Sequence, residues 1–245
     1  MKFVLDVHNH TQASGHAYST IEEYAAAAKK TGCSLIAITE HAPAMPNATG
    51  AFYYENVGII PREINGVKIM VGVELNIMGK DGRVDLDEQL LQRLSPVIAS
   101  FHPPCYRYSK DSMTDDEKTE EITEAIINVM SNPFIDILGH PDDPRYPFNL
   151  ETVVKKSLET GTLLEINNTS LKPGGLRIGS HDALLKMLQF CKKIGCPVVI
   201  GSDAHFSTYT GKLEESIELL KKADFPVELV ANNSVEYFLH LLKRK

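Results

Sequence analysis

Cysteines are few in this sequence, and it lacks long apolar runs, an excess of positive charge and glycine-rich phosphate loops. Four cysteines occur in 245 residues, none in a Cys-x-x-Cys pair, which is too few for a disulfide scaffold of this size. We therefore expect reduced, mostly buried thiols. No apolar run reaches the length of a membrane span, and Asp6 interrupts the short apolar run at the N-terminus, so there is no signal-peptide pattern. These absences predict a cytoplasmic protein without a membrane segment.

The balance of charge narrows the range of partners. The formal net charge is −7 at pH 7. Broad binding to nucleic acid or to a membrane surface needs basic faces, so neither is expected here. A small phosphorylated substrate is compatible with this charge, because a local cluster of metal cations can reverse the sign of the field in a cleft. Without a GxGxxG or GxxxxGK[ST] loop, a nucleotide-binding fold has no support.

Short, almost wholly apolar segments alternate with helical patterns along the chain. Apolar runs such as residues 35–38 are typical of parallel strands buried on both faces. We expect strands at residues 3–7, 35–40, 69–75, 97–101, 135–139, 163–167 and 198–202. We expect helices at about residues 20–31, 87–94, 115–131, 150–160, 181–194, 212–223 and 234–243.

Seven strand-helix units predict a single α/β domain over residues 1–245. This length is usual for one barrel domain, and the pattern favours a TIM-like barrel over the alternative, an open doubly wound sheet. Residues 41–66 show no clear periodicity and are a candidate substrate-facing loop.

Most of the histidines fall where the predicted strands end. Random placement would put about one of the nine there, yet six occur: His8, His10, His41, His102, His140 and His205. Glu74 and Asp203 end the third and seventh strands, and His16 lies in the first loop. In a parallel barrel these ends meet on one face, which is where barrel enzymes place their chemistry. His181 and His240 fit ordinary positions near a helix start and within a helix.

This set of side chains predicts a metal centre. A zinc site takes about four ligands, so seven histidines and two carboxylates would serve two or three divalent ions. Imidazole ligands suit zinc, manganese or iron better than magnesium or calcium. Gathering so many polar groups at a barrel mouth is costly unless something binds them.

The motifs that carry these residues resemble those of the PHP (polymerase and histidinol phosphatase) superfamily, above all its stand-alone YcdX-type phosphatases. They are Asp6-Val7-His8-Asn9-His10, Thr39-Glu40-His41, Gly72-Val73-Glu74, Ser100-Phe101-His102, Gly139-His140-Pro141 and Gly201-Ser202-Asp203-Ala204-His205, supported by residues 16–20 and 164–168. The resemblance runs from residue 6 to about residue 240.

The resemblance implies a distorted (βα)7 barrel with a trinuclear centre at the carboxyl ends of the strands. One ion would be held by His8, His10, Glu74 and Asp203. Glu74 would bridge to a second ion bound by His102 and His140, and His16, His41 and His205 would hold the third. Every family ligand position carries the expected residue type.

Such a centre predicts hydrolysis of phosphomonoesters. Three divalent ions and two carboxylates leave a charge of about +4, which suits a phosphate dianion, and a metal-bridging hydroxide is a nucleophile at neutral pH. Arg177, then Arg62, then Arg145 are the candidates for gripping the phosphate. No general acid for the leaving group stands out.

Three alternatives belong to other classes. An amidohydrolase-type C–N hydrolase commonly uses a carboxylated lysine at a strand end, and no lysine ends a predicted strand here. A nuclease acting on 3′ ends predicts a basic groove or an attached polymerase module. A non-catalytic metal-binding protein is disfavoured by the complete ligand set.

Overall fold

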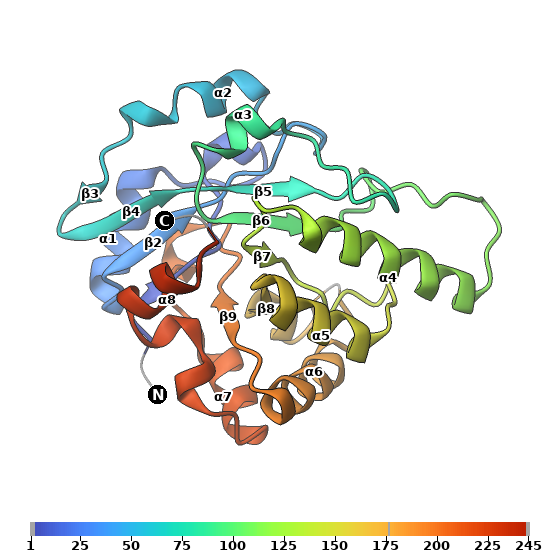
Figure 1. Cartoon of the computed structure of the whole chain (residues 1–245). Coiled ribbons are helices and arrows are strands. Elements are labelled where there is room, and N and C mark those ends of the chain that lie inside the picture. The colour runs from blue at the N-terminus through green and yellow to red at the C-terminus, as the bar shows by residue number, and fades with distance from the viewer. Residues whose placement is uncertain (1–2, 176, 244–245) are drawn as a thin grey trace.

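The computed structural model describes residues 3–175 and 177–243. It has a mixed α/β fold in which helices surround two mainly parallel sheets (Figure 1). The first sheet has the order β1-β2-β4-β3 and consists of Leu5–Asp6, Leu35–Ile38, Val67–Val71 and Glu63–Ile64. The second has the order β5-β6-β7-β8-β9 and consists of Val73–Asn76, Val97–Ser100, Ile137–Leu138, Leu163–Asn167 and Val198–Gly201. Only β3 is paired antiparallel among these named strands.

The helices follow the expected alternation, with the ends set by local caps. They are α1 Ile21–Thr31, α2 Ala51–Glu55, α3 Glu88–Leu91, α4 Asp115–Ser131, α5 Leu150–Thr160, α6 Ser180–Ile194, α7 Glu214–Lys222 and α8 Val235–Leu241. Thr20 and Thr114 start α1 and α4 through capping boxes, which satisfy amides that the first turn leaves free. The segment 41–66 is more ordered than its sequence indicates, because it contains α2, a 3-10 turn at Val57–Ile59 and β3.

The buried strands contribute to two apolar clusters. The larger cluster lies between strands and helices, where Ile36 of β2 and Ile200 of β9 are fully buried. The smaller cluster takes Leu35 from β2 and Ile98 from β6, and Phe238 of α8 packs against it. Because neighbouring residues of a strand point to opposite faces, strands of both sheets turn one face towards this shared interior.

The expected third strand, residues 69–75, is divided at Gly72, where the chain passes from one sheet to the other. The amide of Gly72 donates to the carbonyl of Ile38 at 2.8 Å, while the next amide, of Val73, donates to Pro96 O at 3.2 Å. Consecutive amides thus bond to different sheets. A side chain at Gly72 would place its Cβ 2.0 Å from Pro96 O, so only glycine fits the crossing. Isolated parallel bridges, Asn9–Ala204 and His41–Glu74, also join segments next to the two sheets.

Gly72→Ala should destabilise the protein by about 1–3 kcal/mol, because the added methyl must displace backbone atoms that pair the two sheets. Urea unfolding of the purified variant measures this change in the free energy of unfolding. Gly58→Ala is the matched control, since a Cβ there meets nothing within 4 Å. Equal stability of the two variants would show that the crossing tolerates a side chain.

Two further sequence expectations concern cysteines and membrane segments. All four cysteines are buried, as expected, and none is in a disulfide within the described residues. In the described part of the chain, no helix has both the length and the apolar character needed to span a bilayer.

Candidate metal centre

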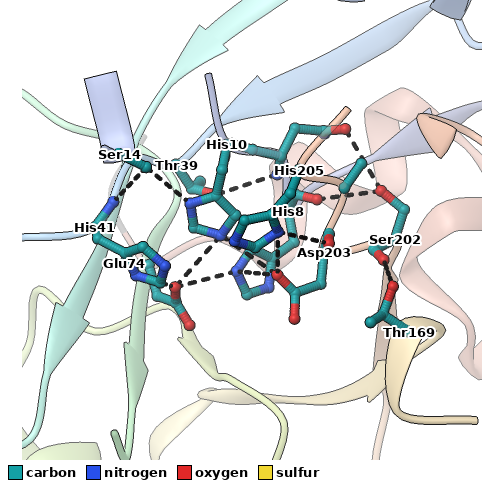
Figure 2. A network of polar contacts seen from close by, with 12 residues as sticks. His8, His10, Ser14, Thr39, His41, Glu74, Thr169, Ser202, Asp203 and His205 are labelled. Carbon is teal, nitrogen blue, oxygen red and sulfur yellow. Dashed lines mark hydrogen bonds and ion pairs between the residues drawn. The ribbon is translucent and has the colours of Figure 1, made fainter. Parts of the chain in front are cut away.

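The nine predicted ligands come together where the strands end, most of them buried. His8 and His10 leave β1 and are fully buried, and Glu74 lies within β5 at 1% exposure. Figure 2 shows the imidazoles of His8 and His10 between the carboxylates of Glu74 and Asp203. Exposure increases towards the rim: His205 is half-buried and His16 is exposed. The centre therefore has a closed floor and one side open to solvent.

Glu74 lies between two groups of imidazoles. Its Oε2 is 3.4 Å from Nε2 of both His8 and His10. Its Oε1 is 3.0 Å from Nε2 of His140 and 3.4 Å from Nε2 of His102. Burial alone would raise the pKa of Glu74, but the surrounding imidazoles hold it well below its usual range. An ionised carboxylate whose two oxygens face different ligand groups has the form of a bridging ligand.

Asp203 faces the same imidazoles from the opposite side. Its Oδ1 lies 3.4 Å from His10 Nε2 and 3.8 Å from His8 Nε2. Its backbone has φ 53°, and His140 has φ 28°, values in the positive range that non-glycine residues rarely adopt. Such strain persists only where the surroundings impose it, and it clusters at functional sites.

Three compact groups of possible ligand atoms lie in the centre and share members, and the first, His8, His10 and Asp203, falls within the set that the family resemblance implies for one ion. His10, His41 and His205 form the second group, and His41, Glu74 and His102 form the third. His41 Nδ1 lies 2.8 Å from Glu74 Oε2. His16 lies beside the second group, with its Nε2 3.1 Å from Nε2 of His205. His10 and His41 therefore stand between the ligand sets that were expected to be separate.

Several buried ligand atoms lack hydrogen bonds, which tests whether metal ions fit. Within the described residues, His8 Nε2, His10 Nε2, His41 Nδ1 and Glu74 Oε2 make no hydrogen bond of acceptable geometry, although His41 Nδ1 and Glu74 Oε2 lie 2.8 Å apart as an ion pair. Buried polar atoms left without partners cost free energy, so native proteins rarely keep them together. Burial, with the charges of His41 and His205, holds the pKa of His10 well below its usual value. A neutral imidazole is the form that binds a metal, so His10 and the unsatisfied atoms around it fit a divalent ion. Burial would also lower the pKa of His8, but the carboxylates of Glu165 and Glu74 raise it well above its usual value.

The other ring nitrogens are held by neighbouring side chains. His8 Nδ1 lies 2.7 Å from Glu165 Oε1, and His102 Nδ1 lies 2.7 Å from Asn76 Oδ1. Glu165 also accepts from the backbone amide of His140 at 2.7 Å. These contacts fix the rings with Nε2 directed towards Glu74, as outer partners do in metal sites.

Sequence reasoning assigned neither Glu165 nor Asn76 a role. The available signal for Glu165 was a charged residue inside the apolar strand β8, where it is fully buried. Asn76, also fully buried, ends β5 two residues after Glu74 and so points to the same face of the strand.

The three candidate arginines lie in different surroundings. Arg177 reaches the centre, with Nη1 3.7 Å from Asp203 Oδ2 and Nε 3.7 Å from Asp143 Oδ2. Arg145 is paired with Asp143, its Nη2 lying 2.5 Å from Oδ2. Arg62 is exposed next to β3, and no contact between its side chain and the centre is found among the described residues. Arg177 is therefore the arginine that the structure brings to the ligands.

Comparison with known proteins finds one matching family model and several full-length relatives with the same name. The family model described as PHP domain matches residues 6–229. A protein of Acetivibrio thermocellus named "Probable phosphatase" is 42% identical over 245 residues, which are 100% of this chain and 97% of that protein. A "Probable phosphatase" of Clostridium novyi is 43% identical over 100% of this chain and 96% of its own length.

Solved structures show the same fold at low identity. The histidinol phosphate phosphatase of Lactococcus lactis, complexed with zinc, L-histidinol and phosphate, matches with a TM-score of 0.65 at 19% identity, over 92% of this chain and 95% of that one. A putative histidinol phosphatase of Listeria monocytogenes matches with a TM-score of 0.62 at 17% identity, over 86% of this chain and 99% of that one. With a family model covering nearly its whole length and full-length relatives above 40% identity, the chain belongs to the PHP domain family.

Proposed function

We propose that this protein is a metal-dependent phosphatase that hydrolyses phosphomonoesters of a small molecule. The observation that carries the proposal is Glu74, whose two carboxylate oxygens face separate groups of imidazoles beside buried ligand atoms that lack hydrogen bonds. The names of the relatives agree with it, and the Lactococcus lactis protein of similar fold was solved with zinc and phosphate.

The proposal includes the architecture of a distorted (βα)7 barrel formed by one domain over residues 1–245. Two observations support it: the crossing at Gly72 and the isolated bridges connect the two sheets, and strands of both contribute to one interior cluster. In such a barrel the carboxyl ends of the strands form the catalytic face.

The centre would hold three divalent ions, with zinc the first choice and manganese or iron the alternatives. His8, His10, Glu74 and Asp203 would hold the first ion. Glu74, His102 and His140 would hold the second, and His16, His41 and His205 the third. The position of His10 and His41 between these sets supports ions that lie close together.

Bound ions would supply positive charge to the phosphate oxygens and activate water at neutral pH. The chain adds a fixed cation beside them, since Arg177 is held by Asp203, by Asp143 and by its hydrogen bond to Ser170 Oγ at 2.7 Å. A guanidinium already fixed in place can bind phosphate oxygens with little loss of side-chain freedom. The opening beside His16 and His205 gives the substrate access.

A substrate panel run with elemental analysis of the same purified protein tests the proposal. We expect inorganic phosphate from small phosphomonoesters, and zinc, manganese or iron bound to the chain. Ammonia from amides with no phosphate release would favour the amidohydrolase alternative. Release of nucleotides from 3′ ends as the main activity would favour a nuclease, and bound metal without any hydrolysis a non-catalytic protein.

Arg177→Ala should raise KM for phosphomonoesters by about 10- to 100-fold, the effect of losing hydrogen bonds to a charged phosphate. Steady-state kinetics and metal content should be measured together, because metal content should not change. Arg93→Ala, at an exposed arginine, is the control. Kinetics equal to the parent would remove Arg177 from the site and make Arg62 the next candidate.

A further inference from the structure

Two polar residues, Ser14 and Glu40, are buried beside the predicted ligands without being ligands themselves. Ser14 is fully buried in the 3-10 turn Gln12–Ser14, which follows His10. Glu40 directly precedes His41 and is 1% exposed. Burying a carboxylate costs free energy unless hydrogen bonds compensate for the lost water, so the partners of Glu40 indicate what it does.

The hydroxyl of Ser14 touches two of the predicted ligands. Its Oγ lies 3.1 Å from Nδ1 of His10 and accepts from the backbone amide of His41, also at 3.1 Å. Figure 2 shows the contacts of Ser14 with both residues. His10 and His41 belong, with His205, to one compact group of possible ligand atoms. A single oxygen atom therefore holds the ring of one member of this group and the backbone of another.

Glu40 directs the hydrogen of this hydroxyl. Ser14 Oγ donates to Glu40 Oε2 at 2.5 Å, and the same carboxylate oxygen accepts from the backbone amide of Thr11 at 3.0 Å. The hydroxyl of Thr11 donates to the other oxygen, Oε1. Burial raises the pKa of Glu40, although these hydrogen bonds oppose the rise. A hydroxyl has one hydrogen, so a Ser14 that donates to Glu40 can only accept from His10 and His41.

This direction of the hydroxyl suits a metal ion on the far side of the His10 ring. Nε2 of His10 lies 3.4 Å from Glu74 Oε2 and 3.4 Å from Asp203 Oδ1. A divalent ion there takes the lone pair of Nε2, so the one hydrogen of the neutral ring must lie on Nδ1. Nδ1 then needs an acceptor, and Ser14 Oγ is one because its own hydrogen is turned towards Glu40.

We propose that Ser14 and Glu40 position His10 for metal binding, with Glu40 acting through the Ser14 hydroxyl. The inference rests on the proposed metal-dependent function. Neither residue touches the metal or the substrate, so both are positioning residues. Loss of such an outer partner typically weakens metal binding by about 10- to 100-fold, because the ligand ring is no longer held in the orientation and tautomer that binding needs.

The test is a double-mutant cycle on zinc affinity, measured by competition with a chelating dye and without any turnover. Ser14→Ala removes the hydroxyl, and Glu40→Gln keeps the shape of the side chain but replaces the carboxylate with a weaker acceptor. A third variant carries both changes. Ser157→Ala is the matched control, since Ser157 on α5 is also buried and its hydroxyl donates to Thr162 O at 2.6 Å.

A second measurement follows the Nδ1 hydrogen of His10 by nuclear magnetic resonance in the zinc-loaded protein, where its signal is identified by its loss in His10→Asn. A hydrogen bond to Ser14 slows the exchange of this hydrogen with water, so exchange should be faster in both single variants. A role in packing alone would not change it. Circular dichroism checks folding, and if Ser14→Ala does not fold, Glu40→Gln carries the test through the same two measurements.

We expect each single change to weaken zinc binding by about 10- to 100-fold, and the double variant to lose no more than Ser14→Ala alone, because Glu40 acts only through the hydroxyl. Ser157→Ala should bind zinc as the parent does. Additive losses, parental affinity in either single variant, or unchanged exchange of the His10 hydrogen overturns the inference. A parent that binds zinc but hydrolyses no phosphate ester refutes the phosphatase proposal and leaves this inference standing, whereas a parent that binds no zinc refutes both.

Discussion

Prolonged chelation should abolish phosphate release, and zinc, manganese or iron should restore it. Bound ions stabilise the transition state of such reactions by several kcal/mol, so we expect the rate to fall by roughly a thousandfold or more. Within the described residues, Arg177 is the one candidate arginine that contacts a predicted ligand, and one cation cannot replace a metal cluster. The measurement is phosphate release before chelation, after it and after titration with each metal.

Two controls separate loss of metal from loss of fold. Circular dichroism should show that the metal-free protein keeps its helices, because the ligands lie at the strand ends and the apolar clusters do not depend on them. Magnesium should restore little activity, since it prefers oxygen ligands to imidazole. Full activity in protein shown by elemental analysis to be free of metal would refute the proposed chemistry.

Glu74→Gln should remove more than one metal ion per chain, which is more than any single histidine change. The parent carboxylate presents Oε2 to His8 and His10 and Oε1 to His102 and His140. A glutamine amide keeps the shape but offers one good ligand oxygen and no charge. Two adjacent dications would then repel each other with less negative charge between them.

His16→Ala is the matched comparison for Glu74→Gln. His16 is exposed, and its imidazole lies against those of His205 and His41. Its loss should weaken only the outermost ion. Metal content per chain is measured for both purified variants, with circular dichroism as a check on folding. A Glu74→Gln protein that retains the parent's metal content and activity would rule out the bridging role and, with it, the trinuclear arrangement.

The position of the candidate metal centre followed from local sequence. Parallel strands buried on both faces consist almost wholly of apolar residues, so a histidine or carboxylate directly after such a run marks a strand end. The ends of parallel strands lie on one side of a sheet whatever the details of packing. For this reason His8, Glu74 and Asp203 could be placed together from sequence, and the structure puts His8 Nε2 3.4 Å from Glu74 Oε2 and 3.8 Å from Asp203 Oδ1.

Other features depend on contacts between residues far apart in the chain. The third strand is divided at Gly72 because the carbonyls of Ile38 and Pro96 accept from the consecutive amides of Gly72 and Val73. The sequence of residues 69–75 does not indicate which distant residues these amides will pair with. The helix α2 is a single short turn of chain, too brief for an apolar period to identify.

The roles of individual polar residues were decided by tertiary structure alone. Arg62 and Arg177 both lie in loop regions of the sequence, but only Arg177 has a counter-charge in the centre among the described contacts. Glu165 holds His8 across 157 positions of sequence. Apolar periodicity reports which face of an element is buried, whereas a side chain's partner depends on how distant segments pack, and local sequence does not encode that.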